Sequence, residues 1–326
     1  MCPAAHLRAV LAIAVALLAG CAATPQTRTL LATPPASLVR AAELATTPFW
    51  PQERYQCGPA ALATVLGANG LAVEPEQLVG EVYVPALQGT LPAEMAGAAR
   101  RHGMLAYRLA PSLRDLLGEV AAGHPVLVLQ NLGMDWLARW HFAVVVGYNL
   151  DKDEIILRSG TTRRWVTPLS VFERTWSRGD YWALVVLPAG DIPVSADALA
   201  YLQAVHDLEN AGQSAAALPA YRAAAKRWPD QAAVWLALGN NRYASVDYEG
   251  AQTAFRTATR LAPGDARGWN NLAYALLKTH CPVQALAAAG CALQLAPDEA
   301  NYRDTVAEIG ALAGDRESAH CEPVSC

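Results

Sequence analysis

The sequence predicts an α+β domain followed by an all-α domain of repeated units. Short helical patterns precede a block of Val-rich strands between residues 46 and 189, and this order is typical of α+β domains. Four units then begin at Ala198, Ala232, Ala266 and Ala300, 34 residues apart, and such a period indicates stacked helical repeats. With 326 residues, 53% of them hydrophobic, the chain is long enough for at least two cores.

The N-terminus has the pattern of an export signal. Basic residues precede an apolar run over residues 9–19, which is short for a membrane span and predicts a signal peptide over residues 1–20. The run ends in Leu18-Ala19-Gly20-Cys21, which resembles a bacterial lipobox. The resemblance implies cleavage before Cys21 and acylation of that residue, and the alternative is an ordinary secreted protein with a chance cysteine.

The residues that follow Cys21 bear on the location. Ala22 stands where an Asp would retain a lipoprotein in the inner membrane, so the resemblance implies an outer-membrane lipoprotein that faces the periplasm. Residues 21–45 mix Thr, Pro, Ala and Gln. This composition predicts a tether that holds the globular part off the membrane, with a short helix over residues 37–44.

The stretch FWPQERYQCGPAALATVL, Phe49 to Leu66, places a cysteine where a loop becomes an apolar helix. Pro59 fixes a helical φ and lacks the N–H that a first turn leaves unpaired, which predicts a helix that starts near Cys57. A helix N-terminus favours negative charge by about 1 kcal/mol, which is less than one pKa unit. Cys57 therefore needs a cationic partner to ionise at neutral pH.

The remaining elements of the first domain follow from periodicity and from Gly and Pro boundaries. Helices are expected over residues 75–82, 92–102, 112–122 and 169–175. Strands are expected over residues 105–109, 125–130, 140–148, 154–158, 164–168 and 181–187, as an antiparallel sheet.

His141 opens the strand WHFAVVVGY, whose other residues are mostly apolar. We therefore expect His141 at the sheet edge and the strand behind it in the core. Residues 149–153 are polar and predict a hairpin turn. Pairing about this turn brings residues 159–162 opposite His141.

A linker over residues 190–197 leads to the repeats of residues 198–314. Large aromatics, small Ala and a Pro between units recur in register, a pattern that resembles tetratricopeptide repeats. Ala289 departs from it where an aromatic is expected, and Arg303 stands at a Trp position. The fourth unit ends near Gly314 and predicts a single capping helix, followed by a tail over residues 315–326.

Cys57 and His141 form a candidate catalytic pair, in which the thiolate attacks a carbonyl and the imidazolium protonates the leaving amine. An oxyanion would need donors, and the N–H of Cys57 is one candidate. Gln52, five residues upstream, is the other candidate, while Gln56 and Gln130 are alternatives. A structural cysteine and a simple strand-edge histidine are the competing interpretation of the pair.

These motifs are similar to a known family. PQERYQCGPAALATVL, followed roughly eighty residues later by WHFAVVVGY and a hairpin, resembles the bacteriocin-processing, double-glycine family of papain-like cysteine peptidases. More closely, it resembles the lipoprotein subgroup that joins such a domain to tetratricopeptide repeats. The resemblance implies a papain-like peptidase fold over residues 46–189 and hydrolysis of peptide or amide bonds.

The family also places an Asp or Asn after the hairpin, where it orients the histidine. In this sequence that place falls in residues 157–161, where neither residue type occurs and Ser159 stands instead. The resemblance therefore assigns the third catalytic position to Ser159. Because the third member orients and does not attack, its replacement does not exclude catalysis.

Four cysteines, Cys281, Cys291, Cys321 and Cys326, lie in the C-terminal part of the chain, and disulfides are permitted in an exported protein. Ten residues of helix would separate the first two by about 15 Å, so pairing with the tail is favoured, for example Cys291 with Cys321. The spacing does not fix the connectivity. No metal or cofactor is expected, because a zinc site needs closer ligand pairs.

Two functions compete at this stage. The first is a membrane-anchored cysteine peptidase whose repeat domain presents a groove to a peptide or protein partner. The second is a non-catalytic papain-like scaffold or binding lipoprotein in an envelope complex, which the absence of Asp or Asn near Ser159 favours. A nucleic-acid partner is not expected, because the net charge is −4 and no basic stripe occurs.

Overall fold

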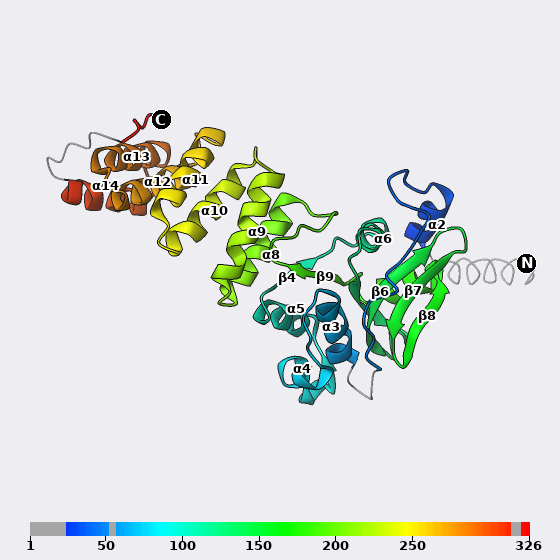
Figure 1. Ribbon diagram of the computed structural model, residues 1–326. Helices are drawn as coiled ribbons and strands as arrows, with labels where there is room; N and C mark the ends of the chain where they lie inside the picture. Colours follow the sequence, from blue (N-terminus) through cyan, green and yellow to red (C-terminus); the bar gives the residue numbers. More distant parts are fainter. Residues whose placement is uncertain (1–23, 52–56, 314–320) are drawn as a thin grey trace, which may run out of the picture. The chain divides into compact units, whose positions relative to one another are not determined.

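The computed structural model describes residues 24–51, 57–313 and 321–326, and Figure 1 shows their arrangement. The chain forms two compact units. The first holds residues up to His102, Ala106–Leu187 and Pro193–Ser195, and the second holds Gly103–Leu105, Pro188–Ile192 and Ala196–Cys326. The predicted signal peptide and Cys21, the predicted lipidation residue, lie outside the described residues.

A seven-stranded sheet forms the centre of the first unit, in the order β4-β9-β5-β6-β7-β8, with β1 paired to β6. The strands β5 to β8 are joined as antiparallel neighbours, as expected. β1 pairs with the last residues of β6, beyond Val145, which is paired with Val126 at the start of β5. The strands are β1 (Ala41–Glu43), β4 (Met104–Arg108), β5 (Val126–Asn131), β6 (Trp140–Asn149), β7 (Glu154–Ser159), β8 (Thr162–Pro168) and β9 (Ala183–Pro188).

Helices cover the sheet. α3 and α6 both pack against β5 and β6, and α7 packs against β5. In Figure 1, α3, α4 and α5 lie together on one side of the strands, and α6 and α2 lie on the other. The helices are α2 (Pro25–Ala32), α3 (Cys57–Ala68), α4 (Pro75–Val82), α5 (Pro92–Arg101), α6 (Leu113–Ala121) and α7 (Leu169–Ser177).

The segment expected to be a tether is folded from residue 24 onward, so that expectation is wrong for this part of the chain. α2 begins with amides that bond to the buried carboxylate of Glu173: Gln26 N donates at 3.0 Å and Thr27 N at 2.7 Å. The helix expected over residues 37–44 is also wrong, because Ala41–Glu43 is the strand β1. Both elements depend on partners far away in the sequence.

A small hairpin lies between α4 and α5 and was not expected. It consists of β2 (Tyr83–Val84), the 3-10 helix η1 (Pro85–Leu87) and β3 (Gly89–Thr90). β2 pairs with β3 in antiparallel register, and Gln88 has a φ of 47° at the turn. This hairpin forms one wall of the cleft described below.

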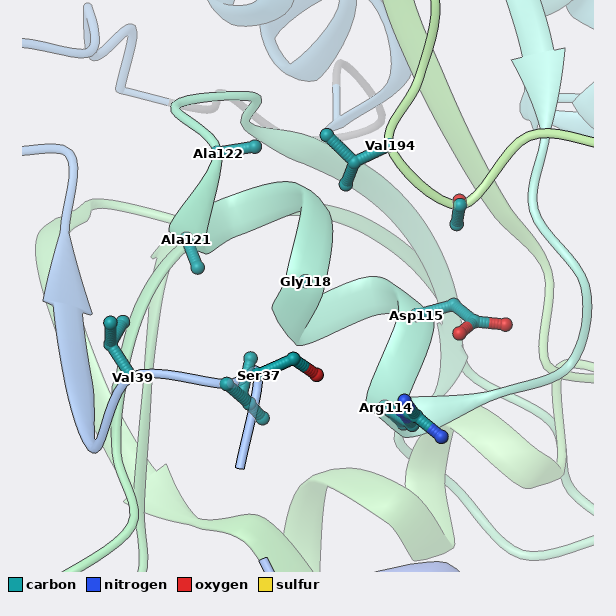
Figure 2. A pocket seen from close by; sticks show the side chains of 10 residues that line it. Ser37, Val39, Arg114, Asp115, Gly118, Ala121, Ala122 and Val194 are labelled. Carbon is teal, nitrogen blue, oxygen red and sulfur yellow. The ribbon is translucent and has the colours of Figure 1, made fainter. Parts of the chain in front are cut away.

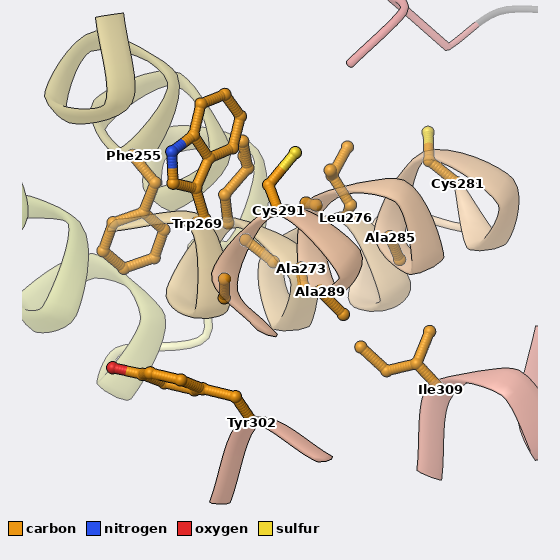
Figure 3. Packing of buried hydrophobic residues seen from close by; sticks show 14 of the residues in the cluster. Phe255, Trp269, Ala273, Leu276, Cys281, Ala285, Ala289, Cys291, Tyr302 and Ile309 are labelled. Carbon is orange, nitrogen blue, oxygen red and sulfur yellow. The ribbon is translucent and has the colours of Figure 1, made fainter. Parts of the chain in front are cut away.

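The second unit consists of helices, and their starts confirm the 34-residue repeat. Its core contains the small Ala side chains and large aromatics that recur in the sequence, as Figure 3 shows. The helices are α8 (Ala198–Asn210), α9 (Ser214–Arg227), α10 (Ala232–Ala244), α11 (Tyr248–Leu261), α12 (Ala266–Lys278), α13 (Pro282–Leu295) and α14 (Ala300–Ala313).

Two disulfides tie the C-terminal tail to α13. Cys281 bonds to Cys321, and Cys291 bonds to Cys326. Pairing with the tail is therefore confirmed, whereas the example pairing of Cys291 with Cys321 is wrong. Cys321 and Cys326 lie only five positions apart, in residues 321–326, which form no helix or strand. The sequence therefore could not distinguish the two arrangements.

Candidate active site

Cys57 is the first residue of α3 and the free cysteine of the described residues. Burial raises the pKa of its thiol, and backbone N–H groups of Phe142, Gly58 and Cys57 itself bond to the sulfur and oppose the rise. Burial prevails, so the pKa lies above the ordinary value of a thiol. The donors at the helix end are present as expected, but Cys57 is a neutral thiol at neutral pH.

His141 is the second residue of β6, where the strand reaches the edge of the sheet. Its Nε2 lies 2.8 Å from the Oγ of Ser159, the last residue of β7. The strand pairing about the hairpin turn thus brings these two residues together, as the sequence predicted. The bond leaves Nδ1 as the ring nitrogen that can serve a reacting group.

The surroundings of His141 disfavour its charged form. Burial, with a smaller contribution from the positive charge of Arg139, lowers the pKa of His141 to about 4. The Ser159 hydroxyl supplies no negative charge that would offset burial. At these pKa values Cys57 and His141 are both neutral at pH 7 before a substrate binds.

Cys57 and His141 line one cleft of about 840 Å³. Its size matches pockets that accept small ligands or peptide side chains. Most of its lining is apolar, and the lining residues come from the hairpin after α4, the start of α5, the end of β5 and the start of β6. The lining residues include Leu87, Thr90, Leu91, Pro92, Leu129, Ala138, Trp140, Phe142 and Gly160.

Gly58 has a steric role beside the nucleophile candidate. A Cβ at Gly58 would lie 2.3 Å from the Oγ1 of Thr90, so β3 approaches α3 as closely as a glycine allows. The Thr90 hydroxyl is buried and has no hydrogen-bond partner within the part of the chain described. Glycine here brings the hairpin wall up to the Cys57 end of α3.

Of the proposed oxyanion donors other than the Cys57 amide, only Gln130 lies among the described residues. Gln52 and Gln56 lie outside the described residues. Gln130 does not line the cleft; its Nε2 donates to the Thr175 hydroxyl of α7 at 2.6 Å.

Another group of Ser, His and Glu lies elsewhere in the first unit, but it is not a catalytic triad. Glu119 is fully buried and accepts bonds from the Ser195 hydroxyl at 2.6 Å and from His124 Nδ1 at 2.7 Å. Burial opposes ionisation of Glu119, and these bonds outweigh it and lower the pKa. The serine contacts the carboxylate and not the imidazole, so the base has no nucleophile to activate.

This carboxylate joins the end of α6 to the segment at Ser195. A hollow of about 440 Å³ lies beside the same helix, and Figure 2 shows Ser37, Arg114, Asp115 and Val194 around it. It contains neither Cys57 nor His141. Across residues 24–51, 57–313 and 321–326, no cluster of His, Cys, Asp and Glu could hold a metal ion.

Comparison with protein families defines the class of both units. The model of the Peptidase C39-like family matches residues 44–181, and a tetratricopeptide-repeat model matches residues 202–245 and 236–303. The chain thus carries an α+β domain of the C39 peptidase type followed by tetratricopeptide repeats, and the expected family and fold class are confirmed. A comparison with curated proteins returns no match.

Solved structures resemble each unit separately. A protein from Bacillus anthracis described as a C39-like peptidase is 18% identical and aligns over 46% of this chain and 98% of its own, with a TM-score of 0.39. The first tetratricopeptide domain of Spaghetti (RPAP3), bound to an HSP90 peptide, is 15% identical over 36% and 93%, with a TM-score of 0.34. MamA from Desulfovibrio magneticus RS-1 is 21% identical over 36% and 66%, also at 0.34.

Sequence reasoning missed the hairpin wall of the cleft. Pro85 and the pair Gln88-Gly89 were usable turn signals, but strands of two residues give no periodicity to detect. It also missed the apolar connection between β5 and β6, because exposed Trp and Met in a loop resemble core residues until the fold is known.

Proposed function

We propose that the protein is a cysteine peptidase in which Cys57 is the nucleophile and His141 is the general base and acid. The bond between His141 Nε2 and Ser159 Oγ carries the proposal. It holds the imidazole in the same cleft as the Cys57 sulfur, and the third residue of the family pattern acts in this way, as an orienting group.

The neutral state of the pair determines the order of the proton transfer. Cys57 and His141 are uncharged before reaction, because burial raises the pKa of one and lowers that of the other. The thiol proton therefore moves to His141 as the sulfur attacks the carbonyl carbon, and His141 then donates it to the leaving amine. The backbone amide of Cys57 is the proposed oxyanion donor, and Gln52 is the proposed second one.

A non-catalytic binding protein is the second candidate. The same pKa shifts favour it, since a buried neutral thiol and imidazole without a carboxylate form a weak nucleophile. In this case the cleft binds a peptide and releases it uncut.

Digestion of reduced, alkylated casein, followed by mass spectrometry of the products, distinguishes the peptidase from the non-catalytic binding protein. The wild-type protein is expected to release peptides, Cys57→Ala to release none, and Ser159→Asp to release them faster, because a carboxylate stabilises the imidazolium that forms during attack. Cys57→Ala also controls for contaminating proteases. If neither the wild type nor Ser159→Asp cuts more than Cys57→Ala, the scaffold function replaces the peptidase.

The repeats are proposed to bind a peptide or protein partner, as repeat arrays of this class generally do. The tetratricopeptide domain of Spaghetti, which aligns with this chain, is bound to an HSP90 peptide. A hollow of about 160 Å³ lined by Asn240, Tyr243, Asn271 and Tyr274 offers amide and aromatic groups for such a contact. Asn240→Ala with Asn271→Ala is expected to weaken partner capture, which pull-down from the source lysate would measure.

We also propose that the mature protein is anchored in the outer membrane, facing the periplasm, by lipid on Cys21. The two disulfides support export, because such bonds persist in oxidising compartments. No helix among the described residues combines the length and the apolar character of a membrane span. Labelling with radioactive palmitate is expected to mark the wild type and not Cys21→Ser, and equal labelling would refute the anchor.

A further inference from the structure

The connection between β5 and β6 carries large apolar side chains in solvent. Residues 132–139 continue the two strands as a hairpin, with Leu132 N bonded to Arg139 O at 2.9 Å. Met134, Trp136 and Leu137 at its tip are exposed, and Trp136 retains 77% of its accessible surface. We call residues 132–139 the apolar tip.

The apolar tip is held in place by specific bonds. Met134 and Leu137 exchange backbone bonds across the turn, at 3.2 and 3.0 Å. The side chain of Asn131 accepts from Gly133 N at 2.9 Å and from Arg139 N at 2.8 Å. A Cβ on Gly133 would lie 2.1 Å from the carbonyl oxygen of Leu137, so the turn requires glycine.

An internally bonded loop that exposes Trp, Met and Leu is costly for a monomer, and contiguous exposed apolar surface marks interaction sites. The position of the apolar tip identifies the interaction. Ala138 within it, and Trp140 directly after it, line the cleft that contains Cys57 and His141. Leu87 and Leu91, which line the same cleft, are also exposed. The cleft is thus lined by exposed apolar residues from two segments that are far apart in the sequence.

We propose that the apolar tip and the Leu87–Leu91 wall bind a polypeptide segment with large apolar side chains next to the residue presented to Cys57. The proposal rests on the proposed function of this cleft and specifies its substrate class. The apolar tip offers Asp135 and Arg139, of opposite sign, as its charged residues, so a strongly charged peptide would gain little. Exposed Trp and Leu at the rim would lose water contact on binding, which is the usual source of affinity at such residues.

A lipid surface is the rival occupant, because a Trp- and Met-bearing tip could also enter a membrane interface. The shared lining favours the peptide. The apolar tip leads directly into the lining of the cleft that contains Cys57 and His141, because Ala138 and the adjacent Trp140 line it. A segment that only inserted into lipid would not need this continuity with the cleft.

Fluorescence anisotropy tests the proposal in the Cys57→Ala protein, which cannot cut its ligand. The probes are a fluorescein-labelled twelve-residue peptide that alternates Leu and Phe with Ser and Gln, and a matched peptide with Thr in place of every Leu and Phe. Trp136→Ser removes the most exposed group of the apolar tip. Trp165→Ser is the control, since Trp165 is 51% exposed on β8 and does not line the cleft. Circular dichroism verifies that both variants fold.

The apolar peptide is expected to bind about ten-fold more tightly than its Thr counterpart, and Trp136→Ser to remove about ten-fold of that affinity while Trp165→Ser does not. Equal affinity for both peptides, or equal losses in both variants, would overturn the proposal. Trp136-dependent sedimentation with phosphatidylglycerol vesicles, without peptide preference, would overturn it in favour of lipid. If the wild-type protein binds the apolar peptide through Trp136 and never cuts it, the peptidase function fails and the binding surface stands.

Discussion

The Ser159 hydroxyl differs from a carboxylate or an amide oxygen in the hydrogen bonds that it can form with His141. An oxygen that only accepts would hold a proton on Nε2, whereas a hydroxyl either donates to Nε2 or accepts from it. Ser159 therefore positions the ring at 2.8 Å without selecting its tautomer or its charge. The sequence revealed the replacement, but its effect on His141 required the burial that the fold imposes.

The low pKa of His141 makes stability depend on pH. It falls from 6.5 to about 4 on folding, so between these pH values the unfolded chain binds a proton that the folded chain does not. The protein therefore loses stability as the pH falls from about 6.5 towards 4, by about 2 kcal/mol between pH 7 and pH 5. Ser159→Asp is expected to reduce this loss, because the carboxylate raises the pKa of the folded state.

Hydrogen exchange of β6 amides, corrected for intrinsic exchange at each pH, measures the effect. His141→Gln is the control, because it removes the titrating group and leaves every other one in place. A loss between pH 7 and pH 5 in Ser159→Asp that equals the wild-type loss would contradict the prediction.

At the scale of elements, two different types of side chain, Trp and Arg, form the same hydrogen bond to a Pro carbonyl oxygen in successive repeats. The indole N–H of Trp235 donates to Pro229 O, and that of Trp269 donates to Pro263 O, both at 2.8 Å. In the last repeat, Arg303 Nη1 makes the same bond to Pro297 O at 2.7 Å. Arg303 is therefore a functional replacement for the Trp in the link between helices, although the sequence presented it as a departure from the pattern.

The elements that the sequence predicted well are those whose signals are local. The helix expected over residues 75–82 is α4, with Pro75 at its start, and the helices that begin at Ala198, Ala232, Ala266 and Ala300 follow the period. Two of the elements that it missed, α2 and β1, are set by remote partners. α2 is capped by Glu173, 147 residues from Gln26, and no local pattern encodes such a contact.

The close approach of β3 to α3 leads to a prediction about Gly58. Gly58→Ala would place a methyl group against Thr90 and is expected to destabilise the protein by about 1–3 kcal/mol. Gly80→Ala, in α4 with open space around it, is the matched control and is expected to stabilise by about 0.5–1 kcal/mol. Thermal denaturation measures both. The three atoms nearest to a Cβ at Gly58 all belong to the Thr90 side chain, so adding Thr90→Gly should restore part of the loss. A Gly58→Ala protein as stable as wild type would refute the clash.

At the scale of the whole molecule, the two units differ in their cysteine chemistry. Both lie in the repeat unit, and each closes a long loop, with sequence separations of 40 and 35. The cysteine of the first unit within the described residues, Cys57, is free. Reductant should thus act on one unit only.

Loss of either bond, by Cys321→Ser or Cys326→Ser, is expected to destabilise the repeat unit by about 4 kcal/mol, because loops of this length gain that much entropy in the unfolded chain. Calorimetry with and without dithiothreitol measures the change, and only the transition of the repeat unit should move. The Cys57→Ala protein should respond to reductant as the wild type does. A reductant effect on the other transition, or on neither, would show that the tail bonds do not stabilise the repeats.

The raised pKa of Cys57 also determines how well its thiol resists oxidation. The thiolate is the form that attacks peroxides and disulfides, so a buried neutral thiol reacts slowly with both. In a compartment that oxidises Cys281, Cys291, Cys321 and Cys326, a thiol that ionised readily would be converted to sulfenic acid or paired with the wrong cysteine. Because the Cys57 thiol is neutral before a substrate binds, it reacts more slowly with a carbonyl. For the same reason it stays unoxidised for longer between encounters with substrate.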